Sequence, residues 1–350
     1  MEPISKASLS SIPTCYATVS VGTPDHDLKD KLKAIAYAGF EGIELGFPDL
    51  LAFASKRASR DVGPQEFDIL CNYGLQINRM CKELRLTIVM LQPLANFEGW
   101  TPQSEERKDA FKRAKGSIRI MEAVGTDMLQ VGSSDAPISI AQDVAVADLK
   151  ELADLLAAHN FRLAYENWCW STHAPDWTHV WDIVKQVDKP NIGLCLDTFQ
   201  TAGGEWADPT TKSGLLESRG SREKMEERFH ESLKSLAATI PPEKIYILQI
   251  SDAYKPIEPL DPTPDESGLR PRGRWSSCLR PVPFDGGYLP VVDVAKAVLE
   301  TGFRDWFSIE VFDGGPDGQD QDWKDMPAYT KKAWKSFDRF RDEVVNVINA

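Results

Sequence analysis

The chain has 350 residues, of which 42% are hydrophobic and 27% are charged, as in ordinary globular proteins. Its formal net charge of −13 disfavours general binding to nucleic acid or to an anionic membrane surface. No apolar stretch approaches the roughly 18 residues that a membrane-spanning helix needs, and the first residues lack a signal-peptide pattern. The six cysteines contain no Cys-x-x-Cys pair. We therefore expect a cytoplasmic protein with reduced cysteines.

Strand-like and helix-like segments alternate eight times along the chain. This alternation predicts one (β/α)8 barrel spanning residues 1–350, with a parallel sheet ringed by helices. The predicted strands cover 15–21, 42–45, 86–91, 128–131, 162–165, 192–196, 245–248 and 306–309. The predicted helices cover 27–38, 65–84, 104–123, 141–158, 176–186, 221–238, 291–299 and 323–347.

Long loops are expected after the second, sixth and seventh strands. They span residues 46–64, 198–220 and 253–288. In a parallel barrel the loops that follow the strands build the active site. The segment 253–288 carries aromatic and basic residues, which favours an active-site lid or substrate loop over a plain surface insertion.

Polar side chains end four consecutive predicted strands: Glu166, Asp197, Gln249 and Glu310. A carboxylate at the end of a buried strand is costly unless it is paired, hydrogen-bonded or bound to a metal. Oxygen ligands suit Mg²⁺ or Mn²⁺, with Co²⁺ as a further option. Any one of these groups can instead cap a helix or pair with an arginine. Glu44 ends another strand and is open to three roles: supporting the site, acting as a base or forming a salt bridge.

Several segments near these residues carry a resemblance to a known family. They are Tyr-Glu-Asn-Trp-Cys-Trp-Ser-Thr at 165–172, Cys-Leu-Asp-Thr-Phe at 195–199, Gln-Ile-Ser-Asp-Ala at 249–253 and Ser-Ile-Glu-Val-Phe at 308–312. Together they resemble the fungal 3-dehydroshikimate dehydratases of quinate catabolism, within the xylose isomerase-like sugar phosphate isomerase/epimerase barrels. The resemblance runs from about Tyr16 to the last helix. The glutamine at 249 favours this branch, because histidine is more usual there in generic isomerases.

The resemblance implies a metal-dependent dehydratase that converts 3-dehydroshikimate to protocatechuate and water through a metal-stabilised enolate. It makes the four strand-end groups the metal ligands and implies substrate contacts, which we expect at Arg272, Ser276, Arg280, Gln92 and Trp168. The partner implied is a small molecule with a carboxylate, which an arginine fork binds well. Catalytic roles are expected for Glu166, Glu310, Gln200 and His173.

The sequence departs from the family pattern at two places. Gln200 stands where some members carry a histidine, and Phe47 replaces a histidine that could serve as the general base. The base is therefore not identified: His173, Glu44 and a metal-bound hydroxide all stay open. An amide does not accept a proton near neutral pH, so Gln200 can only orient substrate or water.

Other functions remain open at this stage. A sugar or sugar-phosphate isomerase or epimerase uses the same site, and the run Arg270, Arg272, Arg274 could bind a phosphate. An endonuclease acting at abasic DNA shares the barrel, but the acidic charge disfavours it. A degenerate barrel that binds a ligand without turnover is supported only by the changes at positions 47 and 200. Both a monomer and a homodimer fit the sequence.

Overall fold

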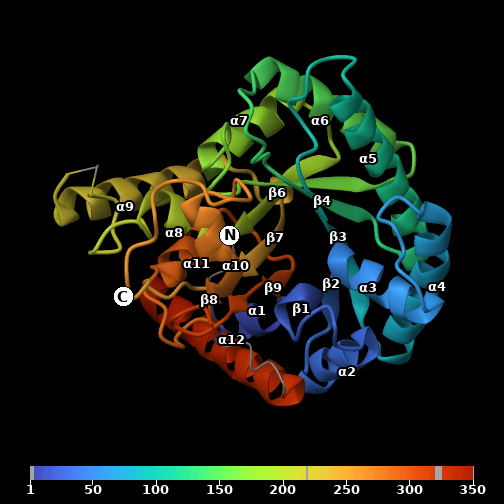
Figure 1. The fold of residues 1–350 in the computed structure, drawn as a ribbon. Helices are drawn as coiled ribbons and strands as arrows, with labels where there is room; N and C mark the ends of the chain where they lie inside the picture. The colour runs from blue at the N-terminus through green and yellow to red at the C-terminus, as the bar shows by residue number, and fades with distance from the viewer. Residues whose placement is uncertain (1–3, 218–219, 320–324, 350) are drawn as a thin grey trace.

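The computed structural model describes residues 4–217, 220–319 and 325–349. Eight parallel strands close into a barrel in chain order, with β9 returning to pair with β1 (Figure 1). This confirms the predicted (β/α)8 class. The barrel strands are β1 (Thr14–Ala17), β2 (Gly42–Gly46), β3 (Thr87–Leu94), β4 (Met128–Gly132), β5 (Arg162–Glu166), β6 (Ile192–Asp197), β7 (Ile245–Ile250) and β9 (Phe307–Ile309).

Helices ring the barrel and bury their apolar faces against it (Figure 1). Helix starts and ends follow local chemistry: Asp27 caps the first turn of α2, and Gly39 ends that helix with a φ of 114°. The outer helices are α2 (Leu28–Ala38), α4 (Phe67–Glu83), α5 (Glu105–Val124), α6 (Gln142–Ala157), α7 (Trp177–Val187), α9 (Arg222–Thr239), α11 (Val291–Glu300) and α12 (Met326–Asn349), with α1 (Lys6–Ser10) before the first strand.

The inside of the barrel is filled from the bottom by apolar side chains. These buried residues form a small core of their own, closed by the half-buried Trp306: Cys15, Val89, Met90, Met128, Ala164, Cys195, Tyr246 and Ile247. Such a plug keeps water out of the barrel from below. Functional groups must therefore gather at the opposite end, where the strands finish.

All three connections expected to be long loops contain regular structure. The connection after β2 holds helix α3 (Phe47–Ala58), and the one after β6 opens with α8 (Thr198–Glu205). The segment 253–288 contains α10 (Pro271–Cys278) and β8 (Leu279–Arg280), which pairs antiparallel with β10 (Phe312–Asp313). Prolines that suggest loops stand in the first turns of α3 and α10, where a missing N–H costs nothing.

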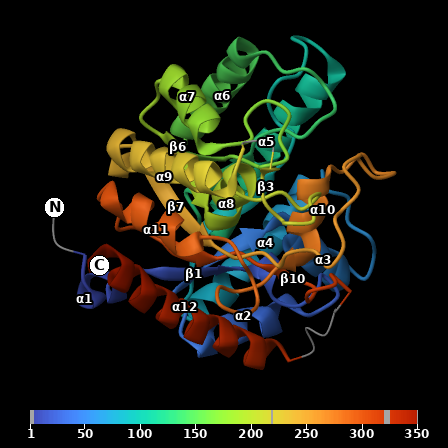
Figure 2. The same cartoon turned by 90° about the vertical axis from the view of Figure 1, so that its left-hand side faces the viewer.

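The first strand is shorter than expected, because residues 18–20 form a 3-10 turn. A second 3-10 turn, Pro242–Lys244, leads into β7. Figure 2 shows α10 at the end of the barrel opposite α1. Within the described residues, no helix is long and apolar enough to cross a membrane.

Candidate active site

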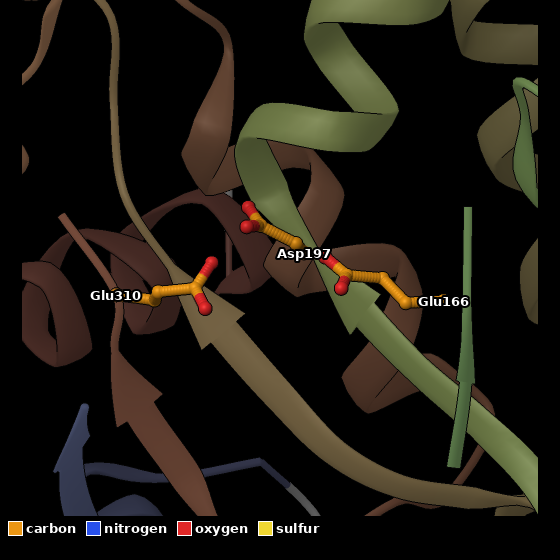
Figure 3. Close-up of side chains that lie close together, drawn as sticks. All are labelled: Glu166, Asp197 and Glu310. Atoms are coloured by element: carbon orange, nitrogen blue, oxygen red, sulfur yellow. The ribbon is translucent and has the colours of Figure 1, made fainter. Parts of the chain in front are cut away.

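Three carboxylates meet at the end of the barrel where the strands finish. Glu166 ends β5, Asp197 ends β6 and Glu310 directly follows β9. Each offers an oxygen atom within 4.8 Å of the other two, and the residues are only 1%, 0% and 6% exposed. Figure 3 shows the three carboxylates pointing toward one another from their separate strands. Part of the ligand set expected from the sequence therefore comes together in one place.

The cluster carries more negative charge than the protein around it balances. Burial raises the pKa of Glu310 to about 8, and burial with its acidic neighbours raises the pKa of Glu166. The buried Arg280 donates from Nη2 to Asp197 and, at 3.2 Å, to Oε2 of Glu310. One guanidinium cannot neutralise three carboxylates, and Oε1 of Glu166 is buried without a hydrogen-bond partner. This donor set fits a divalent cation.

Gln249 does not present its oxygen to the cluster. Its Nε2 donates to Oε1 of Glu310 at 3.0 Å and to Oε2 of Glu44 at 2.8 Å. Its amide oxygen accepts instead from the Cys195 thiol, at 3.1 Å. Ligation by Gln249 needs a half-turn of the amide. As it stands, this residue orients Glu310 rather than completing the ligand set that the sequence predicted.

Glu44 lies beneath the cluster and is fully buried. Gln92 donates to Glu44 at 3.2 Å and to Glu310 at 2.8 Å, so it works in parallel with Gln249. Desolvation raises the pKa of Glu44 to about 7. Glu44 is absent from the lining of the pocket above, and its observed contacts are those of a supporting residue. The two amides thus hold one oxygen of Glu310 in place.

A pocket of about 430 Å³ opens above the carboxylates. One wall is apolar, formed by Val19, Pro48 and Phe312. Polar residues also line the pocket, among them Gln92, Gln130, Gln200, Ser276, Ser277 and Arg280. Its size and mixed lining suit a small polar ring.

A pair of tryptophans forms another wall. Trp168 donates from Nε1 to Oε2 of Glu166 at 3.1 Å, and its ring stacks on Trp170 with centroids 5.1 Å apart. A Cβ on Gly132 would lie 2.1 Å from Cε2 of Trp168, so only glycine leaves room for this indole. Gln130 also donates to Oε2 of Glu166. These contacts orient Glu166, one of the three candidate metal ligands. Residues around a metal ligand commonly have this role.

Arg272 does not reach the pocket, contrary to the expectation that it contacts substrate. Its guanidinium binds the main-chain oxygens of Gly203 and Ala207, each at 2.9 Å. Arg270 and Arg274 also bind main-chain oxygens, so within the described part of the chain these guanidinium groups do not form the phosphate site that the arginine run suggested. Arg270 and Arg272 fasten the segment 253–288 to its surroundings, whereas Arg274 bonds to oxygens within the segment itself.

His173 is also placed away from the pocket. Tyr165, which alternates with Glu166 along β5, points outward, and His173 Nε2 lies 3.2 Å from its hydroxyl and 3.3 Å from Glu98. His173 lines a separate cavity between the helices. The structure thus contradicts the expectation of a histidine base, because His173 sits on the outer side of the strand.

Other predicted residues do lie at the pocket. Gln200 lines it, and its Oε1 accepts from the main-chain N–H of Cys169 at 2.9 Å. Ser276 is buried and accepts from Nη1 of Arg280 at 3.3 Å. Phe47 begins α3, but the next residue, Pro48, is the one that lines the pocket.

Sequence reasoning missed Gln130 and Asp135, which both line the pocket. Gln130 lies on β4 and Asp135 follows it. The signal was present in the order of elements: β4 ends beside β5, so polar groups at its end face the same site.

Comparison with known proteins agrees with this geometry. The profile of the xylose isomerase-like TIM barrel family matches residues 32–333, and the chain belongs to that family. Within it the chain belongs with the 3-dehydroshikimate dehydratases. The protein of that name from Neurospora crassa is 32% identical over 326 residues, covering 88% of this chain and 86% of the relative.

The fold is shared by solved structures, among them the following two. One is a xylose isomerase-like TIM barrel/4-hydroxyphenylpyruvate dioxygenase fusion protein, with a TM-score of 0.70 and 24% identity over 95% of this chain and 43% of its own. The other, the IolI protein with a bound zinc atom, has a TM-score of 0.64 and 18% identity, covering 96% and 99% of the two chains. At these identities the likeness shows the fold alone.

Proposed function

We propose that this enzyme is a hydro-lyase that converts 3-dehydroshikimate to protocatechuate and water. The observation that carries the proposal is the convergence of Glu166, Asp197 and Glu310 beneath a pocket of about 430 Å³. The relative at 32% identity carries the same activity in its name. Acidic clusters of this kind support many reactions on this fold. The activity in the name of the relative is therefore what favours dehydration of 3-dehydroshikimate among them.

Glu166, Asp197 and Glu310 would hold a divalent ion, Mg²⁺ or Mn²⁺ by the chemistry of their oxygens. Such an ion supplies a Lewis acid that polarises the ketone and stabilises the enolate by several kcal/mol. Gln92 and Gln249 hold Glu310, and Gln130 and Trp168 hold Glu166, so the ligands are fixed before substrate arrives.

The protein also supplies contacts for the substrate. Nη2 of Arg280 donates to Asp197, Glu310 and Ser251. Among the described residues Nη1 has one hydrogen-bond partner, Ser276, and so retains a second N–H. That N–H and the Ser276 hydroxyl suit the substrate carboxylate. The apolar wall at Val19, Pro48 and Phe312 covers the flat ring and limits water in the pocket.

The direct test incubates purified protein with 3-dehydroshikimate and Mg²⁺ or Mn²⁺ and follows protocatechuate by ultraviolet absorbance. We expect product formation that EDTA abolishes and fresh metal restores. A Glu310→Ala variant should lose activity with or without added metal. If metal binds to the wild type and no protocatechuate forms, the proposal fails, and sugar isomerisation becomes the next reaction to test.

A further inference from the structure

The pocket contains one carboxylate that the metal cluster does not use. Asp135 lies three residues beyond the end of β4 and lines the same pocket as Glu166 and Glu310. Among the described lining residues, the other ionisable groups are those two glutamates and Arg280. None of those lining residues is a histidine, lysine, tyrosine or cysteine. Asp135 is therefore the group in the described lining that can accept a proton without giving up a place in the cluster.

The side chain of Asp135 is oriented by the tryptophan pair. Trp170 donates from Nε1 to Oδ2 of Asp135 at 3.1 Å, while the stacked Trp168 donates to Glu166, also at 3.1 Å. The two indoles thus hold two carboxylates, one in the cluster and one outside it. Oδ1 of Asp135 has no hydrogen-bond partner among the described residues. An oriented carboxylate with one unbound oxygen in a substrate pocket is the geometry of a general base.

The main chain at Asp135 is held firmly as well. The side-chain oxygen of Asn96 accepts from the N–H groups of Asp135 and Ala136 at 2.9 and 3.0 Å. Arg270 donates to the carbonyl oxygens of Asp135 and Trp170 at 3.0 and 2.6 Å. These bonds fix the carboxylate relative to Glu166, and catalysis depends on such fixed positions.

We infer that Asp135 is the general base of the dehydration, an inference that rests on the proposed function. In this step Oδ1 takes the proton from the carbon beside the ketone. The C–H bond breaks, and its electron pair enters the enolate. The enolate then expels the β-hydroxyl, which leaves as water with the proton that Asp135 returns. The carboxylate of Asp135 is thereby regenerated, and no oxidant or reductant is consumed.

Asp135→Asn is the first test, because its amide oxygen still accepts from Trp170 while the base is removed. We expect kcat to fall by about 10²–10⁴-fold, the usual contribution of a general base. Affinities for Mn²⁺ and for protocatechuate, both measured by calorimetry, should change by less than about threefold, because Asp135 binds neither the cluster nor its supports. Asp143→Asn, at an exposed acid in the first turn of α6, is the matched control and should keep wild-type activity.

Two further variants separate a base from a residue that only positions Trp170. Trp170→Phe removes the N–H donor together with part of the indole ring. It should cost less than about tenfold, because the main-chain bonds to Asn96 and Arg270 still hold Asp135 beside the pocket. Asp135→Gly leaves space for a small acid, and added formate should restore part of its activity.

Activity of Asp135→Asn within tenfold of wild type would overturn the inference. Loss of activity in Asp135→Asn without formate rescue of Asp135→Gly would also overturn it and leave Asp135 a positioning residue. Absence of protocatechuate with the wild-type enzyme would instead overturn the proposed function and this inference together.

Discussion

The barrel interior has a lower half, which is filled by the apolar plug, and an upper half, which carries the carboxylate site. The same strands supply side chains to both halves. On five strands an apolar residue in the lower plug stands two positions before a polar residue of the site: Met90 and Gln92, Met128 and Gln130, Ala164 and Glu166, Cys195 and Asp197, Ile247 and Gln249. Since side chains alternate along a strand, both members of each pair point inward. One step of about 7 Å thus separates a dry core from a charged site.

The contrast explains the properties of the upper half. The plug keeps water away from the carboxylates from below, so burial raises the pKa values of Glu44 and Glu310 to about 7 and about 8. Buried carboxyl groups with raised pKa values are the ones that a bound cation stabilises most. The apolar side chains of the lower half stabilise the fold. The buried carboxylates of the upper half lower the free energy of unfolding but serve to bind a ligand. Changes in the two halves should therefore have separable effects.

The largest effect is expected from Glu166→Gln in the upper half. The variant keeps the shape of the side chain but removes a charged ligand, so kcat/KM should fall by about 10³-fold or more, or roughly 4 kcal/mol. The affinity for Mn²⁺, measured by calorimetry, should fall at least tenfold. Unfolding of the metal-free variant in urea should show no loss of stability, because a buried charge has been removed. A variant that binds Mn²⁺ like the wild type would exclude Glu166 as a ligand.

Ile247→Ala in the lower half should do the reverse. Truncating this fully buried side chain leaves a cavity and should cost about 2–5 kcal/mol of unfolding free energy in urea. Activity per folded molecule should stay near that of the wild type well below the melting temperature. If Ile247→Ala lost activity while remaining folded, the two halves would not be separable.

The dependence of stability on pH should reveal the buried carboxyls directly. Because folding raises the pKa values of Glu44 and Glu310, their stabilising contribution is complete below about pH 4.5 and is lost as pH rises through 7 to 8. Bound metal replaces the missing proton at Glu310, so the rise in melting temperature on adding Mn²⁺ should grow between pH 6 and pH 9. Thermal melts with and without Mn²⁺ measure this difference. If the rise in melting temperature on adding Mn²⁺ became smaller as the pH increased, the assignment of these buried carboxyl groups to a metal site would be contradicted.

The smallest effect is expected from Gly132→Ala, at the last residue of β4. The new Cβ would lie 2.1 Å from Trp168, so the indole must move away from Glu166. We expect about a tenfold fall in kcat/KM and a loss of about 1–3 kcal/mol in stability. The matched control is Gly63→Ala, whose Cβ would meet only Glu66 at an ordinary 3.5 Å. Equal effects of the two substitutions would remove the special role given to the Trp168 contact.

The sequence was enough to predict the barrel and the carboxylates that end its strands. Both follow from local patterns, since apolar runs predict buried strands and a shared direction brings their ends together. Arg272 and His173 were misplaced because their positions depend on partners far along the chain, Gly203 for one and Glu98 for the other. Helix α3 was missed because Gly46 and Pro48, which suggested a loop, stand at its N-terminus.

The central claim is that Glu166, Asp197 and Glu310 hold a divalent ion at the upper end of the barrel. Anomalous diffraction from crystals of the protein grown with Mn²⁺ tests it most directly. We predict one strong anomalous peak within bonding distance of an oxygen from each of the three carboxylates. Ordered crystals with Mn²⁺ present and no peak between these residues would contradict the account.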